Sequence, residues 1–492
     1  MMRYDAVIIG SGLGGLECAH ILSKAGMNVL LLEREAQAGG CIQSYKRHGL
    51  TYDTGFHYVG GLGEGQSLYA AFRELGLLHL PWQRLDEVFD RVTIGDRTFG
   101  FAQGYDAFVD TLAADFPAER KALEKYARIL KKLSGFPMEM LHPLSDKQAT
   151  IPEMFEVNAY QYLTETFHDP LLIQVLSGTS LKMELRQESL PMFTFAHGNS
   201  GFIESSWRLK GDGSLIVNAL LDDIRSYGGE MVLNAEVQEL VEKDGRLIHA
   251  ICSNGEVYEG DRFISDVHPA ITCNWVKQSQ RMRKAYRNRI ERLENTFGMC
   301  TVSLAIRPNS LPYFNWNQYI YKRPNVWNFY REDESVSGVL VSARVPEDGS
   351  EYVRQIDLLT PMRWEQCAAW SDTKIGQRGG EYRVMKNRMA SECVALAEIF
   401  IPGLGDMVTE TYVSTPLTYR DYTLTPQGSA YGLRKDFRNP LMTMLSPRTP
   451  IPNLLLTGQN LMLHGLQGVT MTAFLTCAEV LGREYVWNRL KN

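Results

Sequence analysis

The 492-residue sequence has no long hydrophobic run and no excess of basic residues. No uninterrupted apolar stretch reaches the roughly 18–20 residues that a membrane-spanning helix needs. The 51 Lys and Arg residues are outnumbered by 57 Asp and Glu, and a net charge of −6 argues against a nucleic-acid partner. The first strand-like segment, residues 4–9, leaves no room for a secretion signal before it. We therefore expect a cytoplasmic protein.

Cysteine is also sparse, with eight residues that show no short repeated spacing. This argues against a disulfide framework and a zinc site, so we expect no bound metal. No C-x-x-C pair is present, which argues against a redox-active disulfide. What remains is an ordinary globular composition, 44% hydrophobic and 22% charged, long enough for two or three domains.

A nucleotide-binding fingerprint lies at the start of the chain. Residues 4–9 form a β-branched run typical of a buried parallel strand, and a helical pattern follows from residue 16. The loop between them has the G-x-G-x-x-G spacing and comprises Gly10, Gly12, Leu13, Gly14 and Gly15. In this motif the glycines allow a tight turn, close approach of the backbone to a diphosphate, and close packing of helix on strand. The helix N-terminus then offers N–H groups to the phosphates.

The second strand, residues 28–32, ends in an acid. Glu33 lies close to the spacing of about 20 residues expected for the carboxylate that holds a ribose hydroxyl. The continuation Glu33-Arg34, followed after four residues by Gly39-Gly40, resembles the FAD-dependent amine oxidase and phytoene desaturase superfamily. Relatives carry an E-[RK]-x4-G-G segment here. The resemblance implies that Arg34, Gly39 and Gly40 border FAD.

Residues 51–60 narrow the resemblance. They are similar to the D-T-G-x-H-Y-x-G segment of retinol saturases, a branch of the phytoene desaturase and carotenoid isomerase family. The resemblance places this segment beside the isoalloxazine ring. His57, whose imidazole titrates near neutral pH, and Tyr58 are then candidate catalytic residues. The alternative, that both are packed residues that shape the cavity, stays open because a motif sets position but not role.

A closing motif lies near the C-terminus. A strand-like run from residue 452 leads to Gly458-Gln459-Asn460, and a turn with Gly468 and Val469 opens an apolar helix that we expect to reach about residue 487. This is similar to the family's closing flavin motif. The resemblance implies that N–H groups near Gly468 and Val469 meet the pyrimidine carbonyl of the flavin. It leaves open which of Gln459 and Asn460 holds the ribityl chain.

The middle of the chain completes the pattern. A helix after residue 213, strands 230–234 and 237–241, and a strand ending at residues 263–266 follow the order seen in relatives, where the counterpart of Val237 contacts the adenine through its backbone. We therefore expect an α/β fold in which a Rossmann-type FAD-binding domain is assembled from residues 1–75, 196–270 and 411–492. Residues 76–195 and 271–410 would form an α+β substrate-binding domain.

Residues 118–141 show a pattern unrelated to the nucleotide-binding motifs. One side of the predicted helix 118–133 is apolar and the other is basic, and an apolar segment follows it. Such a helix suits peripheral contact with an anionic membrane. The alternative is the solvated outer face of the substrate domain, a common place for charged residues on helices.

The resemblance implies an FAD-dependent oxidoreductase that acts on carbon–carbon double bonds of a hydrophobic polyene, a carotenoid or retinoid, by desaturation, saturation or isomerisation. FAD would be bound without a covalent link. Only one nucleotide fingerprint is present, so NAD(P)H would be an external electron donor rather than the occupant of a second such domain. Two alternatives remain: a flavin amine oxidase, which needs an aromatic cage at the flavin, and a non-catalytic flavin-binding protein.

Overall fold

Five short strands from the start, middle and end of the chain form one parallel sheet. The computed structural model describes residues 2–135, 139–143, 153–332 and 335–491. The sheet has the order β11-β3-β2-β15-β21, and all neighbouring strands are parallel. Its strands are β2 (Ala6–Ile9), β3 (Val29–Leu32), β11 (Glu230–Val232), β15 (Phe263–Ser265) and β21 (Leu454–Leu456).

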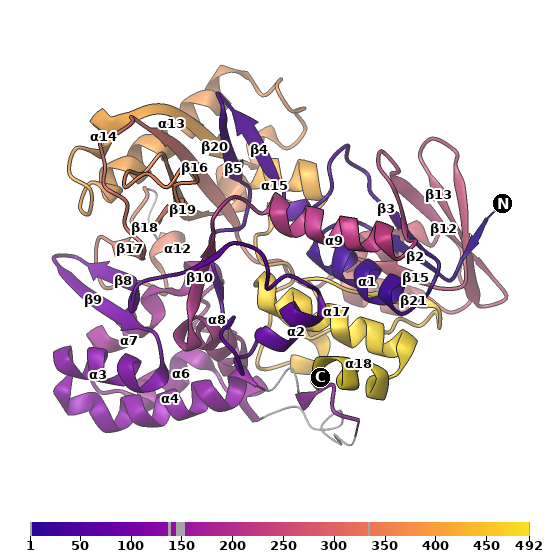
Figure 1. Cartoon of the computed structure of the whole chain (residues 1–492), viewed down its shortest axis with the longest axis horizontal. Coiled ribbons are helices and arrows are strands. Elements are labelled where there is room, and N and C mark those ends of the chain that lie inside the picture. The colour runs from indigo at the N-terminus through magenta and orange to yellow at the C-terminus, as the bar shows by residue number, and fades with distance from the viewer. Residues whose placement is uncertain (1, 136–138, 144–152, 333–334, 492) are drawn as a thin grey trace.

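Helices cover one face of this sheet and a second, smaller sheet covers the other. Ala6 and Ile8 of β2 pack with the helices, whereas Val7 and Ile9 pack with the smaller sheet, as the two-residue period of a strand requires. The helices are α1 (Leu13–Lys24), α9 (Ser214–Ser226) and α17 (Gly465–Leu481). The smaller sheet has the order β1-β14-β13-β12, from β1 (Arg3–Tyr4), β12 (Val237–Lys243), β13 (Arg246–Cys252) and β14 (Val257–Gly260). Figure 1 shows the N-terminal α1 beside the C-terminal α17.

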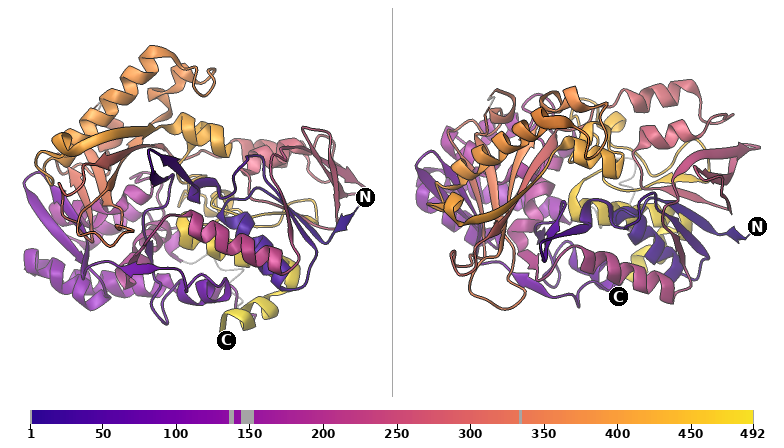
Figure 2. Two further views of the ribbon diagram at one scale, coloured as in Figure 1. Left: turned by 45° about the horizontal axis from the view of Figure 1, so that its top comes forward. Right: turned by 90° about the horizontal axis from the view of Figure 1, so that it is seen from above.

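The second half of the molecule is built on a seven-stranded sheet of order β20-β16-β19-β18-β17-β8-β9. Only the pair β17 and β8 is parallel among these neighbours. One face packs on α13 (Gly379–Ala397) and the other on a helical layer that includes α4 (Arg120–Ser134) and α8 (Met192–Glu204) (Figure 2). The strands are β8 (Val88–Ile94), β9 (Arg97–Ala102), β16 (Gly298–Ile306), β17 (Asn317–Tyr321), β18 (Gly338–Ala343), β19 (Gln355–Met362) and β20 (Val408–Ser414).

Smaller elements connect the two halves. A three-stranded sheet joins β6 (Val59–Gly60), β10 (Ser206–Leu209) and β7 (Trp82–Arg84), and β4 (Ser44–Arg47) pairs with β5 (Leu50–Asp53). The remaining helices are α2 (Tyr69–Glu74), α3 (Tyr105–Asp115), α4 (Arg120–Ser134), α6 (Ala159–Thr166), α7 (Pro170–Gly178), α8 (Met192–Glu204), α10 (Pro269–Trp275), α11 (Lys284–Glu291), α12 (Phe329–Glu332), α14 (Leu404–Met407), α15 (Pro416–Thr423), α16 (Pro440–Thr443) and α18 (Arg483–Lys491).

The predicted fold class is confirmed: the protein is α/β, with a Rossmann-type sheet. One expectation is wrong, because the last helix does not run on to residue 487. Gly482 adopts a φ of +88°, which ends α17 and starts the separate helix α18. The division into two domains stays a proposal. It agrees with the two largest sheets, except that β20 crosses the proposed boundary at residue 410, whereas the three-stranded sheet joins β7 of the proposed substrate domain to β6 and β10 of the proposed FAD domain.

Candidate active site

The glycine loop forms the tight strand-to-helix connection that the sequence predicts. Gly10 has a φ of +94°, and its N–H donates to the Leu32 carbonyl at 2.8 Å. A Cβ on Gly15 would overlap the Gly10 carbonyl oxygen, so only glycine lets α1 start this close to β2. The first turn of α1 holds Leu13, Gly14 and Gly15, all buried.

Three separated glycine segments meet at this loop. A Cβ on Gly40 would lie 3.1 Å from the Gly12 Cα, and one on Gly14 would lie 3.0 Å from the Gly458 backbone. The Gly39 N–H donates to the Ser11 carbonyl at 3.0 Å. Side chains at these positions would therefore fill the space where the segments converge. We call this convergence of residues 10–15, 39–40 and 458 the glycine cradle, and its bare backbone fits an extended diphosphate-linked cofactor.

The Glu33 side chain lies at the edge of the glycine cradle. Its carboxylate accepts hydrogen bonds from the Ser11 N–H at 2.9 Å and hydroxyl at 2.5 Å, and from the Glu35 N–H at 2.8 Å. Arg34 instead pairs with Glu35 and donates to the Asp421 carbonyl, so it ties this loop to α15.

Val237 lies near Glu33, because the Ala235 N–H donates to the Glu33 carbonyl at 2.8 Å. Val237 also borders a cavity of about 390 Å³, which is lined by Glu236, Val237, Gln238, Glu239, Ile251, Cys252, Trp275, Lys277 and Leu424. The predicted adenine contact and the predicted ribose contact are thus brought close together. Their roles stay predictions.

A residue without a predicted role, Asp266, extends its carboxyl into the cradle. A Cβ on Gly14 would lie 2.7 Å from Asp266 Oδ1, and the Gly15 N–H donates to this carboxyl. Burial, with a contribution from the Glu33 charge, raises the pKa of Asp266 to about 7. Its position directly after β15, beside β2 at the carboxyl ends of parallel strands, is the signal that could have identified it.

The closing motif places Gln459 and Asn460 in different surroundings. The Asn460 side-chain oxygen accepts from the Leu433 N–H at 3.2 Å, and its backbone carbonyl accepts from Lys435 Nζ at 3.0 Å. Gln459 is half-buried, and its side chain makes no hydrogen bond within the described part of the chain. Gly468 and Val469 are the fourth and fifth residues of α17, at the end of the first turn, whose N–H groups lack helical partners.

His57 and Tyr58 do not share an environment. His57 Nδ1 lies 3.8 Å from Asp357 Oδ2, and Nε2 is buried without a hydrogen-bond partner among the described residues. Burial lowers the pKa of His57, so the imidazole is neutral at pH 7. The Tyr58 hydroxyl donates to Asp90 Oδ2 at 2.9 Å and lies 2.7 Å from the Tyr319 hydroxyl and 3.1 Å from Lys182 Nζ.

Three side chains deep in the protein near these residues keep exposed surface. The Cys41 side chain is exposed, and burial raises the pKa of its thiol to about 11. The same combination of partial exposure and desolvation holds for Lys182 and His464, with the pKa lowered to about 8 and about 4. We call the region around Cys41, Lys182 and His464 the internal space. Tyr431 borders it, because its ring lies 4.8 Å from that of His464, and Tyr419 hydrogen-bonds to the Thr54 carbonyl.

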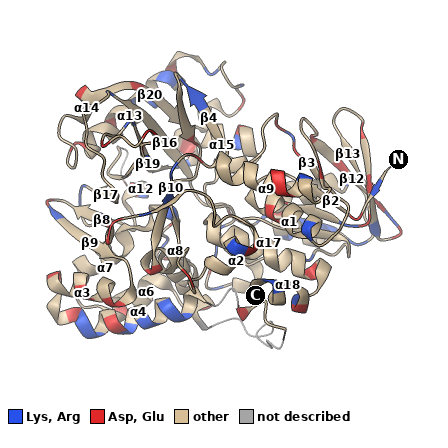
Figure 3. Cartoon of the chain, in the orientation of Figure 1, with Lys and Arg blue, Asp and Glu red and all other residues tan. Residues whose placement is uncertain are grey.

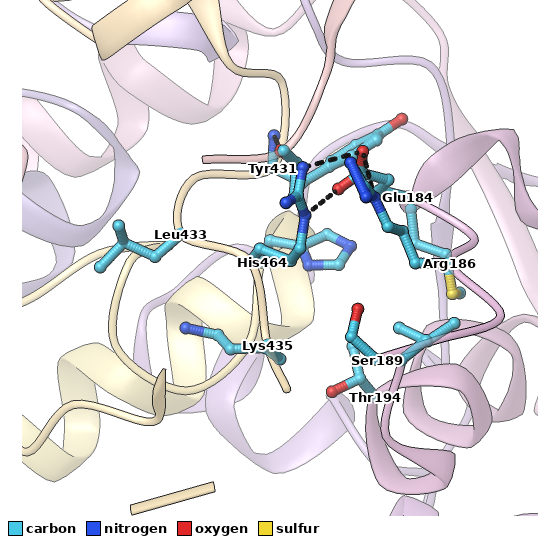
Figure 4. Close-up of a pocket in the computed structure, with 12 residues that line it drawn as sticks. Glu184, Arg186, Ser189, Thr194, Tyr431, Leu433, Lys435 and His464 are labelled. Atoms are coloured by element: carbon cyan, nitrogen blue, oxygen red, sulfur yellow. Dashed lines mark hydrogen bonds and ion pairs between the residues drawn. The ribbon is translucent and has the colours of Figure 1, made fainter. Parts of the chain in front are cut away.

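A small cavity of about 20 Å³ adjoins His464 and has room for about one water molecule. Glu184 pairs there with Arg434 at 2.7 Å, and the Ser189 and Thr194 hydroxyls have no partner among the described residues (Figure 4). Lys435 is buried beside it and donates to three carbonyls, those of Thr443, Asn460 and Leu461. Burial lowers its pKa to about 7. Sequence reasoning missed this lysine, because a single Lys in a loop carries no signal of burial.

Comparison with known proteins supports the resemblance along the whole chain. Residues 8–75 match the family of NAD(P)-binding Rossmann-like domains. The chain is 26% identical to human all-trans-retinol 13,14-reductase, with 100% of this chain and 87% of that protein covered. It is 23% identical to prolycopene isomerase 1 of an Oncidium hybrid cultivar, with 96% and 82% covered. This chain is a relative of these two proteins.

A solved structure shares the fold of this chain. A putrescine oxidase with bound putrescine superimposes with a TM-score of 0.64 at 14% identity, over 100% of both chains. This likeness extends to the fold alone.

Two further features of the structure concern binding of metal ions and contact with membranes. In the described part of the chain, no group of three or more His, Cys, Asp and Glu could hold a metal ion, and no helix is both long and apolar enough to cross a membrane. The basic residues of α4 are exposed, while its apolar side packs into the protein (Figure 3). The predicted apolar segment after α4 includes residues 136–138, which lie outside the described residues.

Proposed function

We propose that the protein is an FAD-dependent oxidoreductase that acts on carbon–carbon double bonds of a hydrophobic polyene. The full-length relation to a retinol reductase and a prolycopene isomerase carries this proposal, since retinol and prolycopene are both polyenes. The glycine cradle supports the cofactor. The internal space beside it supports a small-molecule substrate that enters a desolvated site.

FAD would lie with its diphosphate at the glycine cradle, its adenosine ribose at Glu33 and its adenine at Val237. Gln459 is the better candidate for the ribityl chain, because Asn460 is occupied in holding Leu433. When bound, FAD supplies hydride transfer through its N5 atom. We propose a non-covalent cofactor: the Cys41 thiol has a raised pKa, and Cys477 is buried with its sulfur toward the Cys18 carbonyl. NAD(P)H would be an external donor.

The chain's own residues would orient the substrate and manage protons. His57 offers an unpaired ring nitrogen in a site that keeps the imidazole neutral. Tyr58, Tyr419 and Tyr431 offer aromatic surface for a flat conjugated chain. The desolvated walls would exclude water from a reduced intermediate.

A flavin amine oxidase is the second candidate, because the fold is shared with an amine oxidase. Lys182 counts against it, since a cation at the site repels a protonated amine.

The experiment is anaerobic mixing of the flavoprotein with substrates of both classes. With the flavin reduced beforehand, all-trans-retinol and a panel of carotenoids should reoxidise it or isomerise, and mass analysis would show a gain of two hydrogens for saturation. With the flavin oxidised, loss of two hydrogens would show desaturation. Bleaching by putrescine but by no polyene would overturn the proposal in favour of an amine oxidase. No reaction with either class would favour a non-catalytic flavin protein.

A further inference from the structure

A buried cluster of polar side chains lies at the end of the internal space, and we call it the Lys182 cluster: Tyr58, Asp90, Lys182 and Tyr319. Lys182 Nζ lies 3.1 Å from the Tyr58 hydroxyl, 3.8 Å from Asp90 Oδ2 and 4.0 Å from the centre of the Phe202 ring. The Asp90 side chain is fully buried, whereas 15% of the Lys182 side chain remains accessible. Lys182 is therefore the member of the charged pair that reaches the internal space.

Tyr58 and Lys182 differ in whether they have a free N–H or O–H group to donate to a ligand. A phenol has one proton and accepts at its oxygen. The Tyr58 proton goes to Asp90, so the Tyr319 hydroxyl donates to Tyr58, and the Lys182 ammonium donates as well. Tyr58 thus has no free donor. An ammonium has three N–H groups. One donates to Tyr58, and the Phe202 ring faces Nζ at 4.0 Å. Asp90 Oδ2, at 3.8 Å, is beyond hydrogen-bond distance, so Lys182 keeps an N–H group for a ligand.

The cluster lies next to the helix that carries the predicted flavin contacts. His464, the N-cap residue of α17, has Nε2 3.0 Å from the Lys182 carbonyl. Gly468 and Val469 follow as the fourth and fifth residues of that helix. Lys182 is thus one contact away from the start of α17.

We propose that Lys182 is a catalytic residue that donates a proton to a carbon of the substrate double bond, and that Tyr58 and Asp90 are its positioning residues. This inference rests on the proposed function and names the proton donor for its saturating direction. It moves the acid–base role from the predicted Tyr58 to its neighbour.

The proton balance of saturation is simple. One carbon receives a hydride, which reduced flavin supplies when bound. At the other carbon, the electron pair of the double bond forms a C–H bond with a proton of Lys182 as its N–H bond breaks. The lysine is left as a neutral amine, which regains a proton from solvent before the next cycle.

The surroundings suit this role. Burial lowers the pKa of Lys182 to about 8, and Asp90 opposes the shift by stabilising the ammonium. Asp90 in turn accepts from the Asn317 amide at 2.9 Å, and His464 is neutral because burial lowers its pKa to about 4. A lysine near neutrality can give and regain a proton at physiological pH, which an ordinary lysine does poorly.

The first test measures the titration of the Lys182 amine directly and does not depend on catalytic turnover. Trace acetylation of the FAD-loaded protein at a series of pH values, with each lysine quantified by mass spectrometry, gives a titration for each amine. Lys182 should be modified with a midpoint near pH 8, and Tyr58→Phe should move that midpoint. A midpoint near the ordinary value of about 10.4 would overturn the inference, as would a lack of modification at every pH.

The second test compares Lys182→Met, Lys182→Arg and the control Lys386→Met, which removes another desolvated lysine beside a tyrosine ring. Both Lys182 variants should lose roughly 10²–10⁴ in retinol-dependent flavin reoxidation with unchanged FAD content, because a guanidinium does not release its proton. The control should stay within a few-fold of the parent. Near-parental rates in Lys182→Arg would show that only charge matters and overturn the inference. If the parent itself converts no polyene, the proposed function fails, whatever the acetylation shows.

Discussion

Among single residues, Asp266 sets a condition on cofactor binding. Its carboxyl lies among Gly12, Gly14 and Gly458, the positions that we propose for the FAD diphosphate. Two anions close together in a buried site repel each other, so the diphosphate favours the protonated carboxyl. The N-terminus of α1 would offset part of this repulsion, because the Gly15 N–H donates to the Asp266 carboxyl and a helix N-terminus favours anions.

This gives a pH dependence with a defined sign. The pKa of Asp266 is raised to about 7, so the neutral form prevails below pH 7 and the charged form above it. FAD affinity should therefore fall as pH rises through 7, by up to tenfold per pH unit, and Asp266→Asn should remove this fall. Fluorescence titration of the apoprotein with FAD at several pH values measures it. A parent affinity that is flat from pH 6 to about pH 9 would contradict the role of Asp266.

The cradle glycines could be predicted from sequence because each motif is local: strand, turn and helix follow one another within a few residues. Lys182, Asp90 and Lys435 could not be. Each looks like an ordinary surface residue in its own segment, and only strand pairing far along the chain, such as β17 beside β8, brings their partners together.

Among the helices, α4 is amphipathic because its apolar side packs against the rest of the protein. Its apolar side chains, among them Leu123, Tyr126 and Leu130, are buried in the helical layer. They are therefore not available to enter a membrane. Any membrane contact of this helix would rest on its charges, with Lys125, Arg128 and Lys132 exposed on one side.

Charge removal on α4 tests the proposed membrane contact. Lys125→Ala with Lys132→Ala should weaken binding to anionic vesicles by roughly 30-fold, since each cation near such a surface contributes about 1 kcal/mol. Added salt should have the same effect on the parent. The control, Lys284→Ala with Lys374→Ala, makes the same change in net charge at exposed positions elsewhere. Co-sedimentation that is equal for neutral and anionic vesicles would remove the membrane proposal.

Over the whole molecule, the nucleotide-binding half depends on contacts between chain ends. β2 and β3 come from the first residues, β11 and β15 from the middle, and β21 from the last fifth of the chain. The sequence predicted this assembly because family motifs mark all three regions. It could not predict the seven-stranded sheet, because residues 76–195 and 271–410 carry no such motif and their strands pair across long separations.

A ligand that touches all three regions should stabilise the whole fold. Because FAD would bind only the folded state, FAD at 100 times its dissociation constant should raise the free energy of unfolding by about 2.7 kcal/mol. Glu33→Lys should abolish this gain, since it replaces the carboxylate that holds the Ser11 loop by a cation that the helix N-terminus repels. Thermal unfolding of apoprotein with increasing FAD measures the gain, and the apoprotein midpoint reports any direct destabilisation by the variant. Glu64→Lys makes the same charge change in an exposed loop and should keep the full response. A Glu33→Lys protein that retains FAD through desalting and still gains stability would show that Glu33 does not hold the ribose.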